Sequence, residues 1–274
     1  MGGERTSANR RRGGSVGRKN GPTRAGSREG IRRQSIPRSE DRGSRSSPAL
    51  RSHIERAPGT GLRRLIEESH PPHELDPSLR KRIDALCEEG RDFWHEFDAQ
   101  VRQKEWHSFV AADYDRVRDV LLSLRRRGRR FLEWGSASGV ITIMADLMGF
   151  DACGIEIDAS LVRAARELAD RSDSRARFAV GSFIPMGWRW NPADGDGRTA
   201  TIGQGASGYI ELGRALDEFD VVYGYPWSGE EALMRALMRA HGSREALLVL
   251  HNVENGIKVY RGGKEISLET VAGL

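Results

Sequence analysis

Cysteine, lysine and long apolar runs are all scarce in this chain of 274 residues. The only two cysteines, Cys87 and Cys153, cannot form a disulfide framework, and neither has metal-ligand spacing. The seven histidines form no H-x-x-x-H pair, so the sequence predicts no metal site. No apolar run reaches the roughly 18 residues of a membrane helix, and the N-terminus lacks the apolar core of a secretory signal. We therefore expect a soluble, cytoplasmic protein with no membrane partner.

The basic residues are unevenly distributed, and 39 of them are arginine against 5 lysines. Residues 1–50 carry 13 Lys and Arg against 4 acids, many Gly and Ser, and no aromatic residue. This composition is typical of a disordered basic segment, and it leaves residues 51–274 with a net charge of −4. Two interpretations stay open: a tail that contacts nucleic acid nonspecifically, or an upstream extension from a misassigned start codon. A transit peptide is less favoured, because a Gly-rich stretch would not hold an amphipathic helix.

The remaining length suits a single α/β domain with its own core. We predict a disordered basic tail over residues 1–60, a helical segment over residues 75–130, and the α/β domain over residues 131–274. Within the helical segment, one helix is expected to start at Pro77 and a second at about Asp113, each with apolar residues at helical spacing.

The most informative stretch places a glycine-rich turn between two acidic residues. A predicted strand ends at Phe131 and Leu132, the turn spans residues 135–139, a helix spans 140–148, and a second strand spans 152–157. In a doubly wound sheet, such a turn lets a ligand approach the backbone and the helix N-terminus. An acid at the tip of the second strand, here Glu156, accepts hydrogen bonds from ribose hydroxyls.

The turn does not fit every nucleotide. A dinucleotide fingerprint G-x-G-x-x-G starting at Gly135 would need glycines where the chain has Ala137 and Val140. A phosphate-binding P-loop needs a Gly-Lys-Ser/Thr run, and no lysine lies near. The pattern that remains is Glu133-x-Gly135-x-Ala137-x-Gly139. Its leading carboxylate would repel a pyrophosphate and would suit an ammonium group.

These residues resemble the first motif of the class I S-adenosylmethionine-dependent methyltransferases, usually acid-x-Gly-x-Gly-x-Gly. The resemblance implies an α/β fold with a doubly wound Rossmann-like methyltransferase sheet, and S-adenosyl-L-methionine as the cofactor. Glu133 would lie near the amino-acid moiety of the cofactor, and Glu156 would bind its ribose. Ala137 departs from the commonest pattern, and we expect crowding there and not loss of the site. The cofactor-binding residues that the resemblance implies are Glu133, Gly135, Ser136, Ala137, Ser138, Gly139, Glu156, Ile157, Ser182 and Phe183. The alternative is a turn that serves only strand-to-helix packing.

Two later segments fall where the resemblance expects them. Residues 177–183 resemble the third strand and the turn beside the adenine, where Ser182 replaces the acid of many family members; its hydroxyl or the backbone would make that contact. Residues 219–227 resemble the fourth strand and the catalytic mouth. There, methyltransferases of base amino groups carry Asn or Asp followed by Pro-Pro-aromatic, whereas this chain has Tyr225-Pro226-Trp227. A small-molecule or protein acceptor is therefore favoured over a nucleic-acid base.

The resemblance to the methyltransferases places Tyr223, Tyr225 and Trp227 beside the reacting groups, so these are the catalytic candidates. His251 is a further possible base. Packing of Trp227 as core is the competing interpretation. The function predicted is methyl transfer to an unidentified acceptor. One alternative is a catalytically inactive S-adenosylmethionine-binding module, and a less favoured one is a NAD-dependent oxidoreductase.

Other parts of the chain supply the remaining elements. A glycine-rich insertion is expected over residues 188–213, a helix over 230–241 and a fifth strand over 246–251. Only about twenty residues follow, so the sheet is expected to be abbreviated, with one short pair around Ile257 to Tyr260. The linker Trp106–Phe109 resembles a segment that closes over the cofactor in the family, although packing is the favoured role here.

Overall fold

The computed structural model describes residues 74–104, 107–125, 130–189, 205–227, 229–253 and 255–272. The tail predicted over residues 1–60, the central part of the glycine-rich insertion and Trp106 lie outside the described residues.

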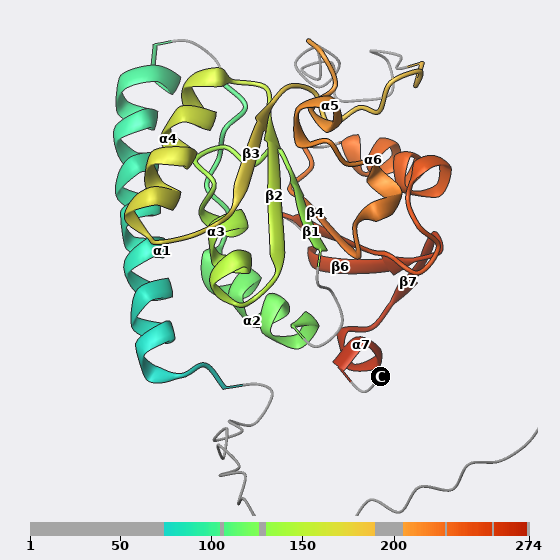
Figure 1. The fold of residues 1–274 in the computed structure, drawn as a ribbon, viewed down its shortest axis with the longest axis horizontal. Coiled ribbons are helices and arrows are strands. Elements are labelled where there is room, and N and C mark those ends of the chain that lie inside the picture. Colours follow the sequence, from blue (N-terminus) through green and yellow to red (C-terminus); the bar gives the residue numbers. More distant parts are fainter. Residues whose placement is uncertain are drawn as a thin grey trace, which may run out of the picture. The chain divides into compact units, whose positions relative to one another are not determined.

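A seven-stranded mixed sheet forms the centre of the described residues (Figure 1). Its strands are β1 (Arg130–Trp134), β2 (Asp151–Glu156), β3 (Arg177–Val180), β4 (Val221–Gly224), β5 (Leu247–Asn252), β6 (Gly256–Arg261) and β7 (Lys264–Ile266). The spatial order is β3-β2-β1-β4-β5-β6-β7, and the first five strands in the sequence are all parallel. The order reverses at β1, which lies between β2 and β4. In open α/β sheets, ligands bind beyond the carboxyl ends of the strands at such a reversal.

The C-terminal edge of the sheet is a hairpin. β6 pairs antiparallel with β5, and β7 pairs antiparallel with β6. The turn between them is Gly262-Gly263, and both residues have left-handed φ values, of 56° and 79°. The family that the sequence resembles implies a helix between the last two strands of a complete sheet, whereas this two-glycine turn joins them directly. The prediction of a doubly wound Rossmann-like sheet is confirmed, and the C-terminal segment supplies a short antiparallel pair, as expected around Ile257 to Tyr260.

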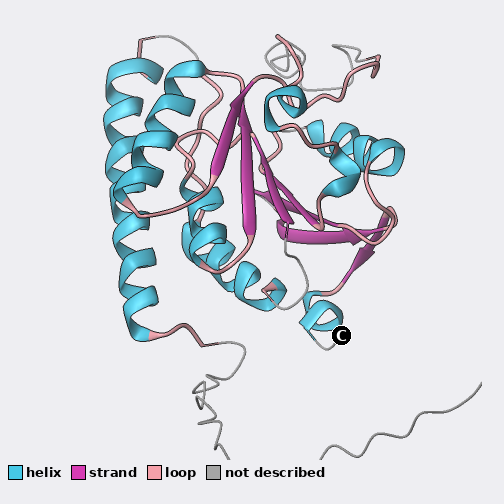
Figure 2. Cartoon of the chain, viewed as in Figure 1, coloured by secondary structure: helices cyan, strands magenta, loops and turns pink. Residues whose placement is uncertain are grey.

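Helices cover both faces of the sheet (Figure 2). The α-helices are α1 (Pro77–Phe97), α2 (Tyr114–Leu124), α3 (Val140–Leu147), α4 (Ala159–Arg171), α5 (Gly208–Leu212), α6 (Glu230–His241) and α7 (Leu268–Ala272). A π-helical turn (Asp98–Arg102) extends α1, and a 3-10 turn (Leu216–Glu218) precedes β4. The apolar core that α1 to α4 and α7 share lies on one face, and the core that α5 and α6 share lies on the other.

Alternation along the strands produces these two cores. On β1, Phe131 belongs to the core beneath α1 to α4, whereas Leu132 and Trp134 belong to the core beneath α5 and α6. All three side chains are almost fully buried, as expected for a parallel strand that is covered on both faces. The same alternation puts Glu133 on the Phe131 side of the strand, where α3 lies.

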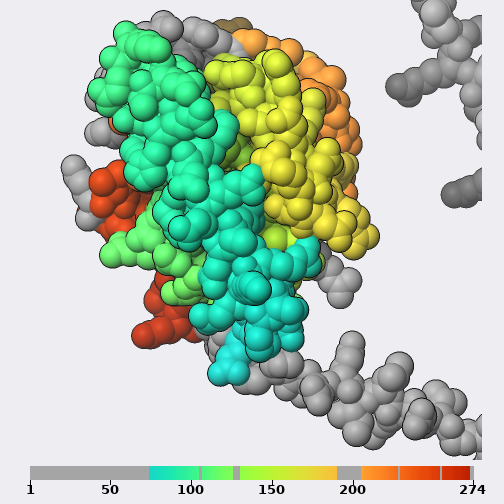
Figure 3. Space-filling model, turned by 90° about the vertical axis from the view of Figure 1, so that its left-hand side faces the viewer, coloured from blue at the N-terminus to red at the C-terminus, as the bar shows by residue number. Residues whose placement is uncertain are grey.

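α1 is the outermost helix of its layer and lies beside α4 (Figure 3). Its start is fixed by Asp76, whose carboxylate accepts hydrogen bonds from the backbone N–H groups of Ser78 and Leu79. Its close approach to α3 depends on Gly90. A Cβ atom at this position would lie 2.4 Å from Val140 Cγ2 and 3.3 Å from the ring of Tyr114.

Gly90→Ala is therefore expected to destabilise the fold by about 2 kcal/mol, because overpacking outweighs the gain in helix propensity. Urea denaturation measures the change. The matched variant Val140→Ala removes the opposing methyl group, so Gly90→Ala should cost less in that background. An equal cost in both backgrounds would show that this contact does not limit the approach of α1.

Candidate functional site

The glycine-rich turn follows β1 and has an unusual backbone. Gly135, Ala137 and Gly139 have φ values of 71°, 45° and 81°, all in the left-handed region. The N–H groups of Gly135 and Ser136 both donate to the Ile155 carbonyl, at 2.9 and 3.0 Å, and these bonds hold the turn against β2. A left-handed alanine costs about 1–2 kcal/mol, so Ala137 is a strained position that its surroundings must hold.

The two glycines of the turn have different roles. A Cβ atom on Gly139 would lie 2.7 Å from the ring of Phe178 and 2.8 Å from Ala165 Cβ, so Gly139 allows close packing. A Cβ atom on Gly135 would meet nothing within 4 Å, and Gly135 is exposed. Gly135 thus lies at the open side of the turn, where a ligand can approach the backbone.

Glu156 ends β2 and is bonded to the turn. Its Oε2 accepts a hydrogen bond from Ala137 N–H at 2.9 Å, and its Oε1 accepts from Ile157 and Asp158 N–H at 2.7 and 2.9 Å. Burial raises the pKa of Glu156, although the three backbone hydrogen bonds oppose this. A carboxylate offers about four lone-pair positions, so these three bonds leave it able to accept another hydrogen bond.

Glu133 lies below the turn and is buried at 4% exposure. Its Oε2 accepts hydrogen bonds from Thr142 N–H at 2.9 Å and from Thr142 Oγ1 at 2.5 Å. Thr142 lies in the first turn of α3, so Glu133 satisfies a backbone donor that the helix leaves unpaired. Burial raises the pKa of Glu133 to about 8, despite the bonds from Thr142 and with a further contribution from the charge of Glu156.

Two cavities adjoin the turn. The larger has a volume of about 110 Å³ and the smaller about 30 Å³. Both are lined by Phe109, Val110, Gly135, Ala137 and Tyr225. The larger cavity adds Glu156, Ile157, Ser182, Phe183 and Trp227, and the smaller adds Glu133, Ser136, Ser138 and Tyr223. Apart from Gly139 and the further possible base His251, all the residues predicted to bind the cofactor or act in catalysis therefore line one cavity or the other.

One polar group of the turn has no partner. Ser136 is 3% exposed, and among the described residues its Oγ has no hydrogen-bond partner. A buried hydroxyl group without a partner is destabilising. Since Ser136 lines the smaller cavity, a polar ligand there could supply the missing partner.

The turn after β3 contributes the apolar ring of Phe183 and the polar side chain of Ser182 to the wall of the larger cavity. The Phe183 ring stacks on Trp134, with centroids 5.1 Å apart and planes at 17°, and the Trp134 indole donates to Tyr209 Oη at 2.8 Å. The Ser182 hydroxyl accepts a hydrogen bond from Ile184 N–H at 3.1 Å, and its backbone N–H donates to the Ala206 carbonyl. A planar group can stack on or beside Phe183, and Ser182 fixes the loop that holds it.

The catalytic candidates Tyr223 and Tyr225 both contact His251. Tyr223 is 1% exposed, and its hydroxyl lies 3.2 Å from His251 Nδ1. The Tyr225 ring stacks on the imidazole, with centroids 4.8 Å apart. Burial lowers the pKa of His251, so the imidazole is neutral at pH 7 and can accept a proton. His251 itself does not line either of the two cavities.

Trp227 is half-buried, and it connects the segment after β4 to the segment around Ser108. Its indole N–H donates to the Ser108 carbonyl at 3.2 Å, and its ring lines the larger cavity. Trp227 is thus not a core residue. It lines the larger cavity and is also held by a hydrogen bond within the protein.

Residues 107–110 belong to the linker for which the sequence favoured packing over closure on the cofactor. Phe109 does pack, against the rings of Phe93 and Phe97, but all four residues also line the larger cavity. His107 Nε2 lies 3.2 Å from Asp158 Oδ2. Burial favours protonation of Asp158, yet hydrogen bonds from Ser160 and His107 outweigh it and lower the pKa. The only sequence signal for this wall was the position of the linker before the first strand of the domain.

Among the described residues, no group of three His, Cys, Asp or Glu side chains could hold a metal ion. Cys87 and Cys153 are both buried free thiols. Within the same ranges, no helix is long and apolar enough to cross a membrane.

The raised pKa of Glu133 predicts a pH-dependent stability. The folded protein binds a proton at Glu133 between about pH 4.5 and pH 8 that the unfolded chain does not bind, so the contribution of this residue falls as the pH rises through that window. Glu133→Gln removes the titration and should flatten the fall. Free energies of unfolding at pH 5 and pH 8, from urea denaturation, measure the effect. Parallel pH profiles for the two proteins would mean that Glu133 is ionised throughout.

No family model matches the chain, and no curated protein matches it in sequence. Solved structures do resemble it in fold. An RNA methyltransferase from Salinibacter ruber in complex with S-adenosyl-L-homocysteine matches at 20% identity and a TM-score of 0.39, over 55% of this chain and 91% of that one. An O-methyltransferase from Bacillus cereus matches at 12% identity and a TM-score of 0.40, over 66% and 69%. The O-methyltransferase TomG from Streptomyces achromogenes matches at 16% identity and a TM-score of 0.37, over 65% and 66%.

Proposed function

We propose that this chain is an S-adenosylmethionine-dependent methyltransferase. The observation that supports it best is the bond between Ala137 N–H and Glu156, which places the left-handed turn beside the acid at the tip of β2. This position lies at the reversal of strand order, where α/β sheets bind nucleotides. Among the described residues, no lysine or arginine lines either cavity, so neither suits a pyrophosphate.

The residues present fit S-adenosylmethionine group by group. Glu156 would accept a hydrogen bond from a ribose hydroxyl, and the ring of Phe183 with Ile157 would contact the adenine. Glu133, Ser136 and Ser138 would face the amino-acid moiety, where the unpaired Ser136 hydroxyl needs a partner. When bound, the cofactor supplies an electrophilic methyl group on a sulfonium.

The protein's part in methyl transfer is mainly to align the acceptor and exclude water. Tyr225 and Trp227 line the larger cavity after β4, where they would hold the acceptor. Tyr223 contacts His251, and a neutral imidazole there could take a proton through the Tyr223 hydroxyl. A phenol at position 225 does not provide the amide or carboxylate that base amino-group methylation uses, which favours a small-molecule or protein acceptor.

Ligand entry requires a conformational change. The larger cavity holds only about 110 Å³, whereas pockets for drug-sized ligands have about 300–1,000 Å³. Residues 107–110 form one wall and are held by the Trp227 indole and by Asp158. We infer that this segment moves outward when the cofactor binds.

A second candidate function is cofactor binding without chemistry. The hydroxyl of Tyr223 and the indole of Trp227 already have partners within the protein, which favours a structural role for both. Release of S-adenosylhomocysteine in a screen of small-molecule and peptide acceptors would support the enzyme. Cofactor binding without any release would support the binding module.

Two glycine substitutions with similar strain test the turn. Gly135 and Gly149 both have left-handed φ values, of 71° and 98°, and both have open space where a Cβ atom would be added. Only Gly135 lines the cavities. Gly135→Ala should therefore weaken S-adenosylmethionine binding by about tenfold or more in calorimetry, whereas Gly149→Ala should cost a similar amount of stability and leave binding unchanged. Equal affinities for both variants would make the turn structural only.

Glu156→Gln tests the ribose contact with little change in shape. Loss of the charged acceptor should weaken S-adenosylmethionine binding by about 1.5–3 kcal/mol, the usual contribution of a hydrogen bond to a charged group. Glu211→Gln is the matched control, because Glu211 also accepts a backbone hydrogen bond, from Val180 N–H, but lines neither cavity. The assignment fails if the two variants bind the cofactor with the same affinity.

A further inference from the structure

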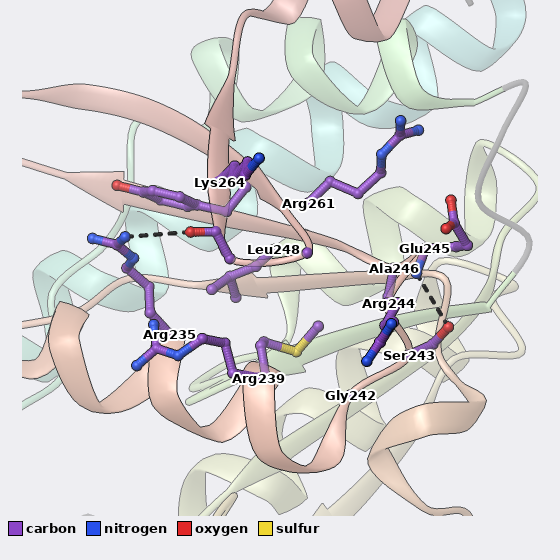
Figure 4. Close-up of a pocket in the computed structure, with 14 residues that line it drawn as sticks. Arg235, Arg239, Gly242, Ser243, Arg244, Glu245, Ala246, Leu248, Arg261 and Lys264 are labelled. Atoms are coloured by element: carbon purple, nitrogen blue, oxygen red, sulfur yellow. Dashed lines mark hydrogen bonds between the residues drawn. The ribbon is translucent and has the colours of Figure 1, made fainter.

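A second and larger cavity lies away from the proposed cofactor site. It has a volume of about 530 Å³ and lies between the C-terminal half of α6, the loop before β5 and the β6–β7 turn (Figure 4). That loop enters β5 at Leu247, whereas Tyr225 and Trp227 follow the carboxyl end of the neighbouring strand β4. The basic cavity therefore lies at the amino ends of the parallel strands and the proposed cofactor site at their carboxyl ends. Among the described residues, the two share no lining residue.

Cationic side chains dominate this cavity. Arg235 and Arg239 come from α6, Arg244 from the loop, and Arg261 and Lys264 from the hairpin. Glu245 is the one acidic residue among the described lining residues, which together have a formal charge of +4. The C-terminus of α6 adds only about half a negative charge.

Four of the five cations have no carboxylate partner among the described residues. The exception is Arg235, which lies 3.7 Å from Glu231. Elsewhere on the domain, arginines such as Arg130 and Arg214 lie within 2.7 Å of an aspartate oxygen. Cations without a nearby counterion make the potential around the cavity positive, and an anion would be attracted there.

Side chains on α6 contact the hairpin that forms the other side of the cavity. The Arg235 guanidinium lies 4.6 Å from the centre of the Tyr260 ring and donates to the Gly263 carbonyl at 3.5 Å. Its buried Nε has no acceptor among the described residues. The left-handed Gly262-Gly263 turn comes close to Arg239, whose Cγ and Cδ lie 3.2–3.3 Å from the Cβ position of Gly263. The cations therefore belong to three segments that pack together.

The geometry points to a binding site for a small polyphosphate group. Guanidinium groups bind phosphate oxygens in pairs, and several guanidiniums around one cavity match a ligand with several adjacent phosphates. The volume of about 530 Å³ fits a small ligand such as a nucleoside triphosphate or an inorganic polyphosphate. This site is independent of methyl transfer, because it shares no residue with the proposed cofactor site.

Binding of inorganic tripolyphosphate to the full chain tests this inference. The double variant Arg239→Glu with Arg244→Glu reverses two exposed charges of the cavity. The control is Arg80→Glu with Arg163→Glu, which makes the same change in net charge at exposed positions on α1 and α4. Calorimetry at about 0.15 M salt reduces nonspecific attraction to the basic N-terminal segment, which all three proteins share.

The cavity variant should bind tripolyphosphate about tenfold more weakly or worse, whereas the control should stay within about twofold of the original chain. Arg239→Gln with Arg244→Gln should give a smaller loss in the same direction, and unchanged circular dichroism would show that these proteins fold. A nucleoside triphosphate and a short single-stranded RNA in parallel titrations identify the natural source of the phosphates. Equal losses in the cavity and control variants, no binding of tripolyphosphate, or binding of the RNA alone would overturn the proposal.

Discussion

The hydrogen bond of 2.9 Å from Ala137 N–H to Glu156 joins the two parts on which the site depends. It connects the turn after β1 to the tip of β2, and it uses a left-handed alanine to do so. The same carboxylate accepts two further backbone bonds where β2 leads into α4. One side chain thus fixes the turn, the strand end and the approach to the next helix, and it keeps an acceptor position at the cavity wall.

The basic cavity and the two cavities beside the turn differ in the sign of the charged residues that line them. Glu133 and Glu156 flank the turn at the carboxyl ends of the parallel strands. The basic cavity between α6 and the hairpin lies at the amino ends of these strands. A ligand with a positive sulfonium and an ammonium group suits the acidic residues beside the turn, whereas phosphates suit the basic cavity. Glu133 has a raised pKa of about 8, so an ammonium group beside it would favour ionisation and release a proton near neutral pH.

The sequence predicted the sheet and the turn well, because their signals are local. The helix start at Pro77, the helix over residues 230–241 and the glycine-rich turn all follow from short patterns. Closure of the linker over the cofactor was only the less favoured interpretation, because the contacts of residues 107–110 with Trp227 and Asp158 span more than fifty residues. The basic cavity was missed for the same reason: its cations come from three segments that only the hairpin fold brings together. The spacing of apolar residues along the chain predicts helices and strands, but it contains no information on such long-range contacts.

Binding of S-adenosylmethionine by the turn and Glu156 can be measured by calorimetric titration of the full chain with S-adenosylmethionine, S-adenosylhomocysteine and NAD. We expect both sulfur compounds to bind at one site, to compete with each other, and to lose affinity together in Glu156→Gln. Binding of NAD without either sulfur compound would rule out this cofactor site and would favour an oxidoreductase.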